Sequence, residues 1–150
     1  MGSVRAAASA DAAHMAEIDA RVSMSPRSEK QFQRVCDNTT LAGERALLWQ
    51  EATQVAGFVI ISAVLDEANI HNIAVAPDYQ KRGIGGALLQ AALEFMAVGG
   101  ITRCLLEVRE SNLAARALYG QFGFELDGVR PRCYPTEQGR EDALLMSRQE

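Results

Sequence analysis

The stretch QKRGIGGALL, residues 80–89, decides the fold of this chain. It follows an apolar, strand-like segment at residues 68–75 and opens a run with helical periodicity. Its three glycines let a strand-to-helix turn approach a ligand closely, because no Cβ stands in the way. The free N–H groups of the helix's first turn and the positive end of its dipole then form a phosphate site. With Lys81 and Arg82 at its mouth, the loop predicts a site for a pyrophosphate group.

The spacing of these glycines excludes two common nucleotide-binding loops. A P-loop needs G-x-x-x-x-G-K-[ST], and no Lys-Ser or Lys-Thr follows the glycines. The dinucleotide pattern G-x-G-x-x-G fails because Leu88 stands at its third glycine position. The loop instead resembles the Q-x-x-G-x-G-x-A-L-L motif of the GNAT (Gcn5-related) N-acetyltransferases, which holds the pyrophosphate of coenzyme A. The resemblance implies acetyl-coenzyme A as cosubstrate, with its pyrophosphate held at Lys81, Arg82, Gly83, Ile84, Gly85 and Gly86.

A second segment, residues 112–124, reads N-x-x-A-x-x-L-Y-x-x-x-G-F and also resembles GNAT enzymes. In that family the corresponding helix lies along the pantetheine arm of the cofactor. Helical spacing places three residues on one side, where they would face the cofactor: Asn112, Ala115 and Tyr119. The expected core-facing residues of the same helix are Ala114, Ala117 and Leu118.

Length and composition agree with a compact enzyme and argue against a disordered or general nucleic-acid-binding chain. At 150 residues, the chain has the size of one domain, which we expect to span residues 1–150. Its residues are 48% hydrophobic and 23% charged, as in ordinary globular proteins. A formal charge of −4 argues against general nucleic-acid binding and is compatible with a basic peptide or amine as partner.

The cysteines and apolar stretches predict a cytoplasmic protein without a membrane segment. Cys36, Cys104 and Cys133 form no C-x-x-C pair, so we expect reduced thiols, with Cys104 filling the core. With two scattered histidines, no metal site is expected. The longest uncharged apolar stretch, residues 55–65, is far shorter than the roughly 20 residues of a spanning helix.

The hydrophobic pattern predicts a mixed α/β protein. Strands are expected at residues 4–7, 45–50, 55–65, 68–75, 102–108, 125–130 and 142–147. Helices are expected at residues 11–22, 28–36, 84–98 and 112–122. The helix at 84–98 carries two apolar stripes, one of them through Ala91 and Phe95, and should be largely buried. This order matches a GNAT fold, with a single mixed β-sheet flanked by helices on both faces.

Transfer of an acetyl group from a thioester to an amine needs a base and an acid. The amine must be neutral to attack, and a peptide α-amino group has a pKa of about 7.7–8.0, so a nearby carboxylate helps to remove its proton. The departing thiolate then needs a proton, which a tyrosine hydroxyl can supply. Glu107, in an otherwise apolar strand, is the candidate base and Tyr119 the candidate acid. From the residues alone, Tyr119 could equally pack in the core, and Glu107 could pair with Arg103 or Arg109 in water.

Three tracts give a narrower resemblance, at residues 66–80, 105–112 and 134–143. They are similar to the GNAT enzymes that acetylate the N-terminal alanine of a small-subunit ribosomal protein, and the likeness covers most of residues 54–146. It implies Glu107 as general base and Tyr119 as general acid, with direct attack in a ternary complex. Because this mechanism has no acyl-enzyme, the resemblance implies no nucleophilic role for Cys104. The implied cofactor contacts are the backbone of Ile73, Ala74 and Val75 against pantetheine, and Asn112.

Two patches beside the expected acceptor groove depart from that branch. Residues 24–28 lack the tryptophan of the usual F-x-W-S motif. Near residue 133, Cys133-Tyr134 stands where two tyrosines often precede Pro-Thr, and Pro131 interrupts the preceding basic stretch. We expect Arg130 and Arg132 to be solvated charges and His71 to hold a structural position in a strand.

Three functions therefore stay open. The first is acetylation of a protein N-terminus, with a ribosomal protein as the expected partner and neither nucleic acid nor membrane involved. The second is a GNAT enzyme that acts on a small amine or a lysine side chain. The third is a non-catalytic module that binds acyl-coenzyme A and regulates a partner. The sequence leaves the oligomeric state undetermined.

Overall fold

The computed structural model of the chain describes residues 2–41 and 43–149. The strands are β1 (Gly2–Ala6), β2 (Arg45–Glu51), β3 (Gln54–Val64), β4 (Glu67–Val75), β5 (Arg103–Arg109), β6 (Glu125–Thr136) and β7 (Gly139–Gln149). The helices are α1 (Ala12–Val22), α2 (Glu29–Cys36), α3 (Ile84–Val98) and α4 (Leu113–Gln121), with short 3-10 turns at Ser9–Asp11 and Pro77–Tyr79. Strands and helices alternate in the predicted order.

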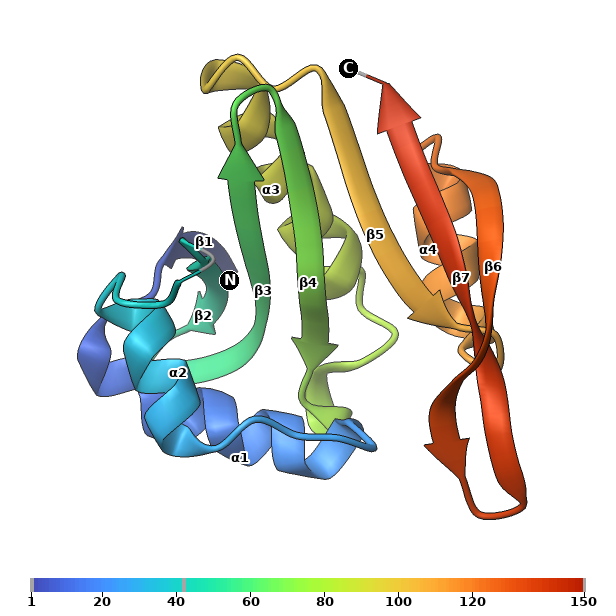
Figure 1. Ribbon diagram of the computed structural model, residues 1–150. Coiled ribbons are helices and arrows are strands. Elements are labelled where there is room, and N and C mark those ends of the chain that lie inside the picture. Colours follow the sequence, from blue (N-terminus) through green and yellow to red (C-terminus); the bar gives the residue numbers. More distant parts are fainter. Residues whose placement is uncertain (1, 42, 150) are drawn as a thin grey trace.

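All seven strands form one mixed sheet in the order β1-β2-β3-β4-β5-β7-β6. β4 and β5 are parallel and are joined through α3, whereas the other neighbouring pairs are antiparallel. The α/β fold with a single mixed sheet is therefore confirmed. β4 and β5 lie side by side at their N-terminal ends, where the connection from α3 enters β5, and they diverge toward their C-terminal ends (Figure 1).

Helices cover both faces of the sheet, as predicted. Side chains of a strand alternate between faces, and β3 is buried on both. Phe58 and Ile60 pack with α1 and α2, while Val59 and Ile61 pack with α3 and Tyr119 of α4. Figure 1 shows α3 and α4 behind the sheet and α1 and α2 at its other side. No helix in the described ranges is long and apolar enough to cross a membrane.

The two last strands are longer than predicted. The expected segments 125–130 and 142–147 extend to Thr136 in β6 and across Gly139–Gln149 in β7. The register of β6 shifts between Arg130 and Tyr134, and Pro131 lies within that irregularity. A bulge tolerates proline because its missing N–H removes no ladder hydrogen bond there. Pro131 therefore bends β6 rather than ending it.

Two predicted burial patterns are wrong. Phe95 is 52% exposed, because the buried face of α3 is centred on Leu88, Ala92 and Met96 and leaves Phe95 at its rim. In α4, Ala114 and Ala117 are exposed, whereas Tyr119 packs in the core beside Phe124 at 5.8 Å between ring centroids. The side of α4 that was expected to face a cofactor therefore also faces the core. Cys104 is fully buried, as predicted.

Candidate active site

A cleft opens where β4 and β5 separate. Within the described residues their ladder runs from Glu67 paired with Arg103 to Ile70 paired with Leu106, and both strands continue beyond it. Residues 73–75 remain paired with β3 on their other side. Unpaired main-chain groups at a strand edge seek hydrogen-bond partners. Successive residues of a strand turn their N–H and C=O groups to opposite edges, and the Ala76 N–H donates to Ala56 of β3, so Ala74 also faces β3. The backbone groups of Ile73 and Val75 face the cleft, where the Gln80 side chain already donates to the Val75 carbonyl at 3.0 Å.

The glycine loop lies at the end of β4 and leads into α3. Lys81 and Gly83 adopt left-handed backbone angles, with φ of 64° and 82°, and Gly83 is the N-cap of α3. The amides of Ile84, Gly85 and Gly86 then stand in the first turn, where a helix leaves its N–H groups unbonded. The Ile84 side chain is buried, so its backbone is the part that faces outward. This turn has the donors that a pyrophosphate requires.

Arg82 is not a free cation at the mouth of this loop. Its guanidinium donates to Glu51 of β2 at 2.6 Å and lies 5.3 Å from the centroid of the Tyr79 ring. The pair holds the pKa of Glu51 below its usual range. Because each guanidinium carries five N–H donors, Arg82 keeps donors for a phosphate while it contacts Glu51.

A cavity of about 260 Å³ in the cleft brings the predicted acid and base together. It is lined by Glu107 of β5, Tyr119 of α4, Ile73 of β4 and Asn112. Burial raises the pKa of Tyr119 to about 12, so this hydroxyl keeps its proton at neutral pH. Asn112 caps α4 by accepting the Ala115 N–H at 3.2 Å, which engages its side-chain oxygen. The loop at residues 80–86 does not line this cavity and forms a separate part of the cleft.

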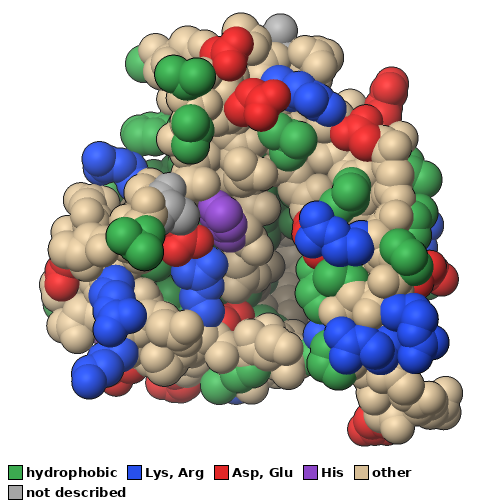
Figure 2. Space-filling model, viewed as in Figure 1, with side chains coloured by type: hydrophobic (Ala, Val, Ile, Leu, Met, Phe, Trp, Pro, Cys, Tyr) green, Lys and Arg blue, Asp and Glu red, His purple; other side chains and the backbone are tan. Residues whose placement is uncertain are grey.

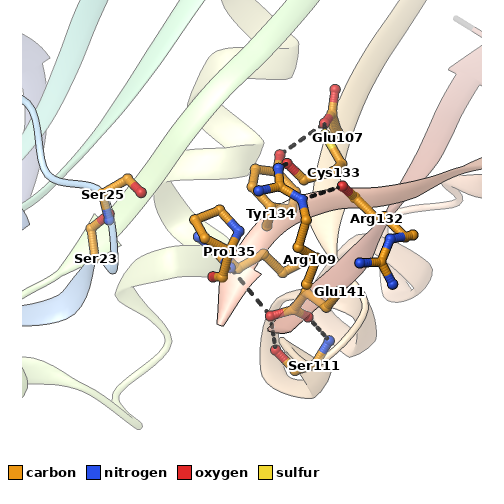
Figure 3. Close-up of polar contacts among 11 residues, drawn as sticks. Ser23, Ser25, Glu107, Arg109, Ser111, Arg132, Cys133, Tyr134, Pro135 and Glu141 are labelled. Atoms are coloured by element: carbon orange, nitrogen blue, oxygen red, sulfur yellow. Dashed lines mark hydrogen bonds and ion pairs between the residues drawn. The ribbon is translucent and has the colours of Figure 1, made fainter. Parts of the chain in front are cut away.

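Glu107 is held by side chains of β6 and not by the two arginines expected from the sequence. Tyr134 Oη donates to Glu107 Oε1 at 2.9 Å, and Cys133 Sγ lies 3.5 Å from the same oxygen (Figure 3). Arg130 donates to Glu107 Oε2 at 3.3 Å. Arg103 and Arg109 pair elsewhere, with Asp127 and Glu141. Arg130 was expected to be only a solvated charge, but it also donates to Glu107.

Tyr134 is braced from its other side. The Arg109 guanidinium lies 4.3 Å from the centroid of the Tyr134 ring and also donates to the Pro135 carbonyl at 3.2 Å. Partial burial and the Glu107 carboxylate raise the pKa of Tyr134 to about 12, so it remains a donor. Sequence reasoning missed this contact because the bulge in β6 sets which residue reaches Glu107.

The opposite wall of the cavity is the 23–28 loop between α1 and α2. Ser23, Ser25 and Arg27 line it, and Figure 3 shows both serines across the gap from Tyr134 and Pro135. These small hydroxyl side chains occupy the region where the sequence lacks the expected tryptophan. Arg132 is exposed, as predicted.

The cleft continues along the face of the sheet into a second cavity of about 630 Å³. Both cavities are lined by His71, Glu107 and Tyr134, so they meet beside the candidate base. His71 lies in β4, as expected, and its Nε2 is 2.6 Å from Ser62 Oγ. Figure 2 shows a hollow near the centre of this face, with Lys and Arg side chains on the wall formed by the C-terminal strands.

Comparison with known proteins agrees with this geometry. The sequence matches the Acetyltransferase (GNAT) family over residues 12–124. The chain belongs to the GNAT family. Among GNAT relatives, the [ribosomal protein bS18]-alanine N-acetyltransferase of Escherichia coli K12 is 43% identical over 132 residues, which cover 87% of this chain and 85% of that protein. The enzyme of the same name from Salmonella typhimurium LT2 is 40% identical, over 87% of this chain and 86% of its own.

Solved GNAT structures have the same fold. The crystal structure of the ribosomal-protein-S18-alanine N-acetyltransferase from Escherichia coli superposes with a TM-score of 0.89 and 37% identity, and covers 99% of this chain and 94% of that one. The structure of yncA from Salmonella typhimurium with its cofactor acetyl-CoA has a TM-score of 0.84 and 20% identity, and covers 99% and 93%. This second likeness supports the GNAT fold alone.

Proposed function

We propose that this enzyme transfers an acetyl group from acetyl-coenzyme A to the α-amino group of an N-terminal alanine, with ribosomal protein bS18 as acceptor. The observation that carries the proposal is the 43% identity, over 87% of the chain, to an enzyme named for that reaction. The presence of Glu107 and Tyr119 in one cavity supports it. A ribosomal acceptor places the reaction in the cytoplasm, and residues 1–150 act as one catalytic domain.

The cleft has groups that suit the donor. The backbone groups of Ile73 and Val75, on either side of Ala74, would pair with the amides of the pantetheine arm, as a strand pairs with its neighbour. The pyrophosphate would bind the α3 N-terminus, where Gly83, Ile84, Gly85 and Gly86 supply backbone and Lys81 and Arg82 supply charge. Asn112 would contact the arm near the cavity. Acetyl-coenzyme A supplies the activated thioester carbonyl.

The reaction then needs one proton removed and one supplied. As the neutral amine attacks the thioester carbonyl, the C–N bond forms and Glu107 takes the proton that leaves the nitrogen, directly or through a water. The C–S bond breaks, and the Tyr119 hydroxyl protonates the departing thiolate. Burial raises the pKa of Tyr119 to about 12, so its hydroxyl carries the proton that the sulfur needs. No residue becomes acylated.

The test is mass spectrometry of peptides incubated with the enzyme and acetyl-coenzyme A. One peptide carries the Ala-initiated N-terminus of bS18, a second begins with another residue, and a third has a blocked N-terminus and a free lysine. Acetylation of the free N-termini, strongest on the bS18 peptide, is expected. Acetylation of the blocked peptide at lysine, without acetylation of the free N-termini, would contradict the proposal and favour the second function class. Cofactor binding without any transfer would favour the non-catalytic module.

A further inference from the structure

The 23–28 loop forms the wall of the catalytic cavity that faces Glu107, yet few of its own side chains hold it in place. Within the loop, the Ser25 N–H donates to Ser23 Oγ at 3.1 Å. The loop is bonded to the rest of the fold at its start by the Ser23 N–H, which donates to the Asp19 carbonyl at 2.8 Å, then through Arg27, and at its end through the cap of α2 by Ser28. Arg27 is the residue of this segment whose side chain forms an ion pair with a distant strand-proximal carboxylate, that of Glu44.

Arg27 is anchored twice. Its backbone N–H donates to Asp19 Oδ2 at 2.8 Å, and its guanidinium binds both oxygens of Glu44, at 3.0 Å and 2.7 Å. Asp19 is 1% exposed and Glu44 is 8% exposed. Buried carboxylates require hydrogen-bonded or charged partners, and a two-pronged arginine contact fixes direction as well as distance. Arg27 holds the pKa of Glu44 below its usual range.

Both anchors lead to neighbouring residues of β4. Asn72 Nδ2 donates to Asp19 Oδ1 at 3.1 Å, and His71 Nδ1 lies 3.7 Å from Glu44 Oε2. Partial burial lowers the pKa of His71, so this ring is neutral at pH 7 and Arg27 supplies the cation facing Glu44. Residues 73–75, directly after these two, form the cleft edge proposed to hold pantetheine. β4 therefore ties the acceptor wall and the donor edge to one rigid element.

We propose that Arg27 is a positioning residue for the acceptor, which sets the 23–28 loop opposite Glu107 through Glu44 and Asp19. This inference rests on the proposed function, because it assigns the loop to the acceptor side of that reaction. Loss of the anchor should misplace the wall while leaving the α3 N-terminus untouched. The effect should therefore fall on the acceptor and not on acetyl-coenzyme A.

The experiment compares Arg27→Gln with wild type and with Arg34→Met, an exposed arginine of α2, as the matched control. In Arg27→Gln, the KM for the bS18 peptide should rise by roughly ten- to a hundredfold, as expected for a reactant displaced by about 1 Å. The affinity for acetyl-coenzyme A, measured by calorimetry, should stay within a factor of two of wild type. Arg27→Lys, which retains the charge but not the two-pronged geometry, should recover part of the loss.

A double variant, Arg27→Gln with Glu44→Gln, separates positioning from simple destabilisation. Removing one partner of a buried pair leaves an uncompensated charge, whereas removing both relieves it. If Arg27 positions the loop, the melting temperature recovers in the double variant while the peptide KM stays high. Three results would overturn the inference. The first is recovery of both the melting temperature and the peptide KM in the double variant, and the second is an unchanged peptide KM in folded Arg27→Gln. The third is a loss of acetyl-coenzyme A affinity as large as the loss for the peptide.

Failure of the proposed function has a different signature, namely that wild type itself does not acetylate the bS18 peptide. In that case hydrogen exchange of the backbone amides of the loop (residues 23–25, 27 and 28, since Pro26 has none), measured without any acceptor, still tests the anchor. Faster exchange in the double variant than in wild type and Arg34→Met would support it. Unchanged protection of these amides would overturn it.

Discussion

Two tyrosines in the cavity, Tyr119 and Tyr134, share a raised pKa and differ in their proposed roles. Burial is the main cause for both, and each pKa lies at about 12. Both phenols are therefore protonated at working pH. Tyr134 donates its hydrogen bond to Glu107. Under the proposed mechanism, Tyr134 would orient Glu107 and Tyr119 would supply the proton to the leaving group.

Tyr119→Phe tests the acid. The turnover number should fall by about 10²–10⁴, the usual contribution of a general acid. Because the ring is retained in the core, the thermal melt should change little, and calorimetric affinity for acetyl-coenzyme A should match wild type. An unchanged turnover number in this variant would refute the role of Tyr119.

Tyr134→Phe tests the orientation of Glu107. A hydrogen bond to a charged group contributes about 1.5–3 kcal/mol, so loss of this one should lower the turnover number by roughly tenfold or more. The matched control is Cys133→Ala, which removes the longer contact of 3.5 Å and should have a much smaller effect. Equal turnover in Tyr134→Phe and wild type would mean that Glu107 needs no such support.

At the scale of elements, the short β4–β5 ladder and the start of α3 determine the site. The strands pair over residues 67–70 and 103–106 and then diverge, which exposes backbone that a longer ladder would consume. Gly83 caps α3 with a positive φ, and the glycines after it leave the first turn of the helix bare. Strand edge and helix end thus present main-chain donors along one cleft.

Gly85→Ala tests the bare turn. A Cβ at Gly85 would lie 3.5 Å from Leu118 and 3.9 Å from Val75, which are ordinary contacts, so the fold accepts it. Alanine in place of glycine in a helix stabilises by about 0.5–1 kcal/mol. The melting temperature should therefore rise while acetyl-coenzyme A affinity, measured by calorimetry, falls. Gly128→Ala, a substitution in β6 away from the glycine loop, is the control. Normal acetyl-coenzyme A affinity in Gly85→Ala would contradict our assignment of the turn as the pyrophosphate site.

At the scale of the whole molecule, the buried polar network beside the cleft couples stability to pH. Two carboxylates with lowered pKa values, Glu44 in this network and Asp11 in its separate pair with Arg5, contribute stability that is lost at pH below about 4.5. The protonation of His71 affects stability in a higher pH range. Its lowered pKa means that the folded chain binds fewer protons there than the unfolded chain, so stability falls as pH drops below about 6.5.

His71→Gln should flatten this part of the profile. Between pH 7.5 and 5, the melting temperature of wild type should decrease more than that of the variant, measured by calorimetry or circular dichroism. His14→Gln, which removes the exposed histidine of α1, is the matched control. Parallel profiles for wild type and His71→Gln would show that the protonation of His71 is not linked to folding.

Much of the fold and half of the candidate site could be predicted from local patterns. Helix and strand periodicity located each element, and the glycine spacing located the turn before α3, because both depend on near neighbours in the chain. The predicted lengths of β6 and β7 were wrong. Pro131 predicts the end of a strand unless the bulge around it is known. Whether Tyr119 packs in the core was left open by the sequence, because helical spacing gives a face but not what packs against it.

The sequence by itself determined the family, the order of elements and the identity of Glu107 and Tyr119 as candidates, because motifs carry these at fixed spacing. Only the tertiary structure decided that Tyr134 and Arg130 hold Glu107, that Arg82 pairs with Glu51, and that Arg27 anchors the 23–28 loop. In the order given, the paired residues are separated along the chain by 27, 23, 31 and 17 positions. Sheet register and packing bring such pairs together, and neither is encoded in a local pattern.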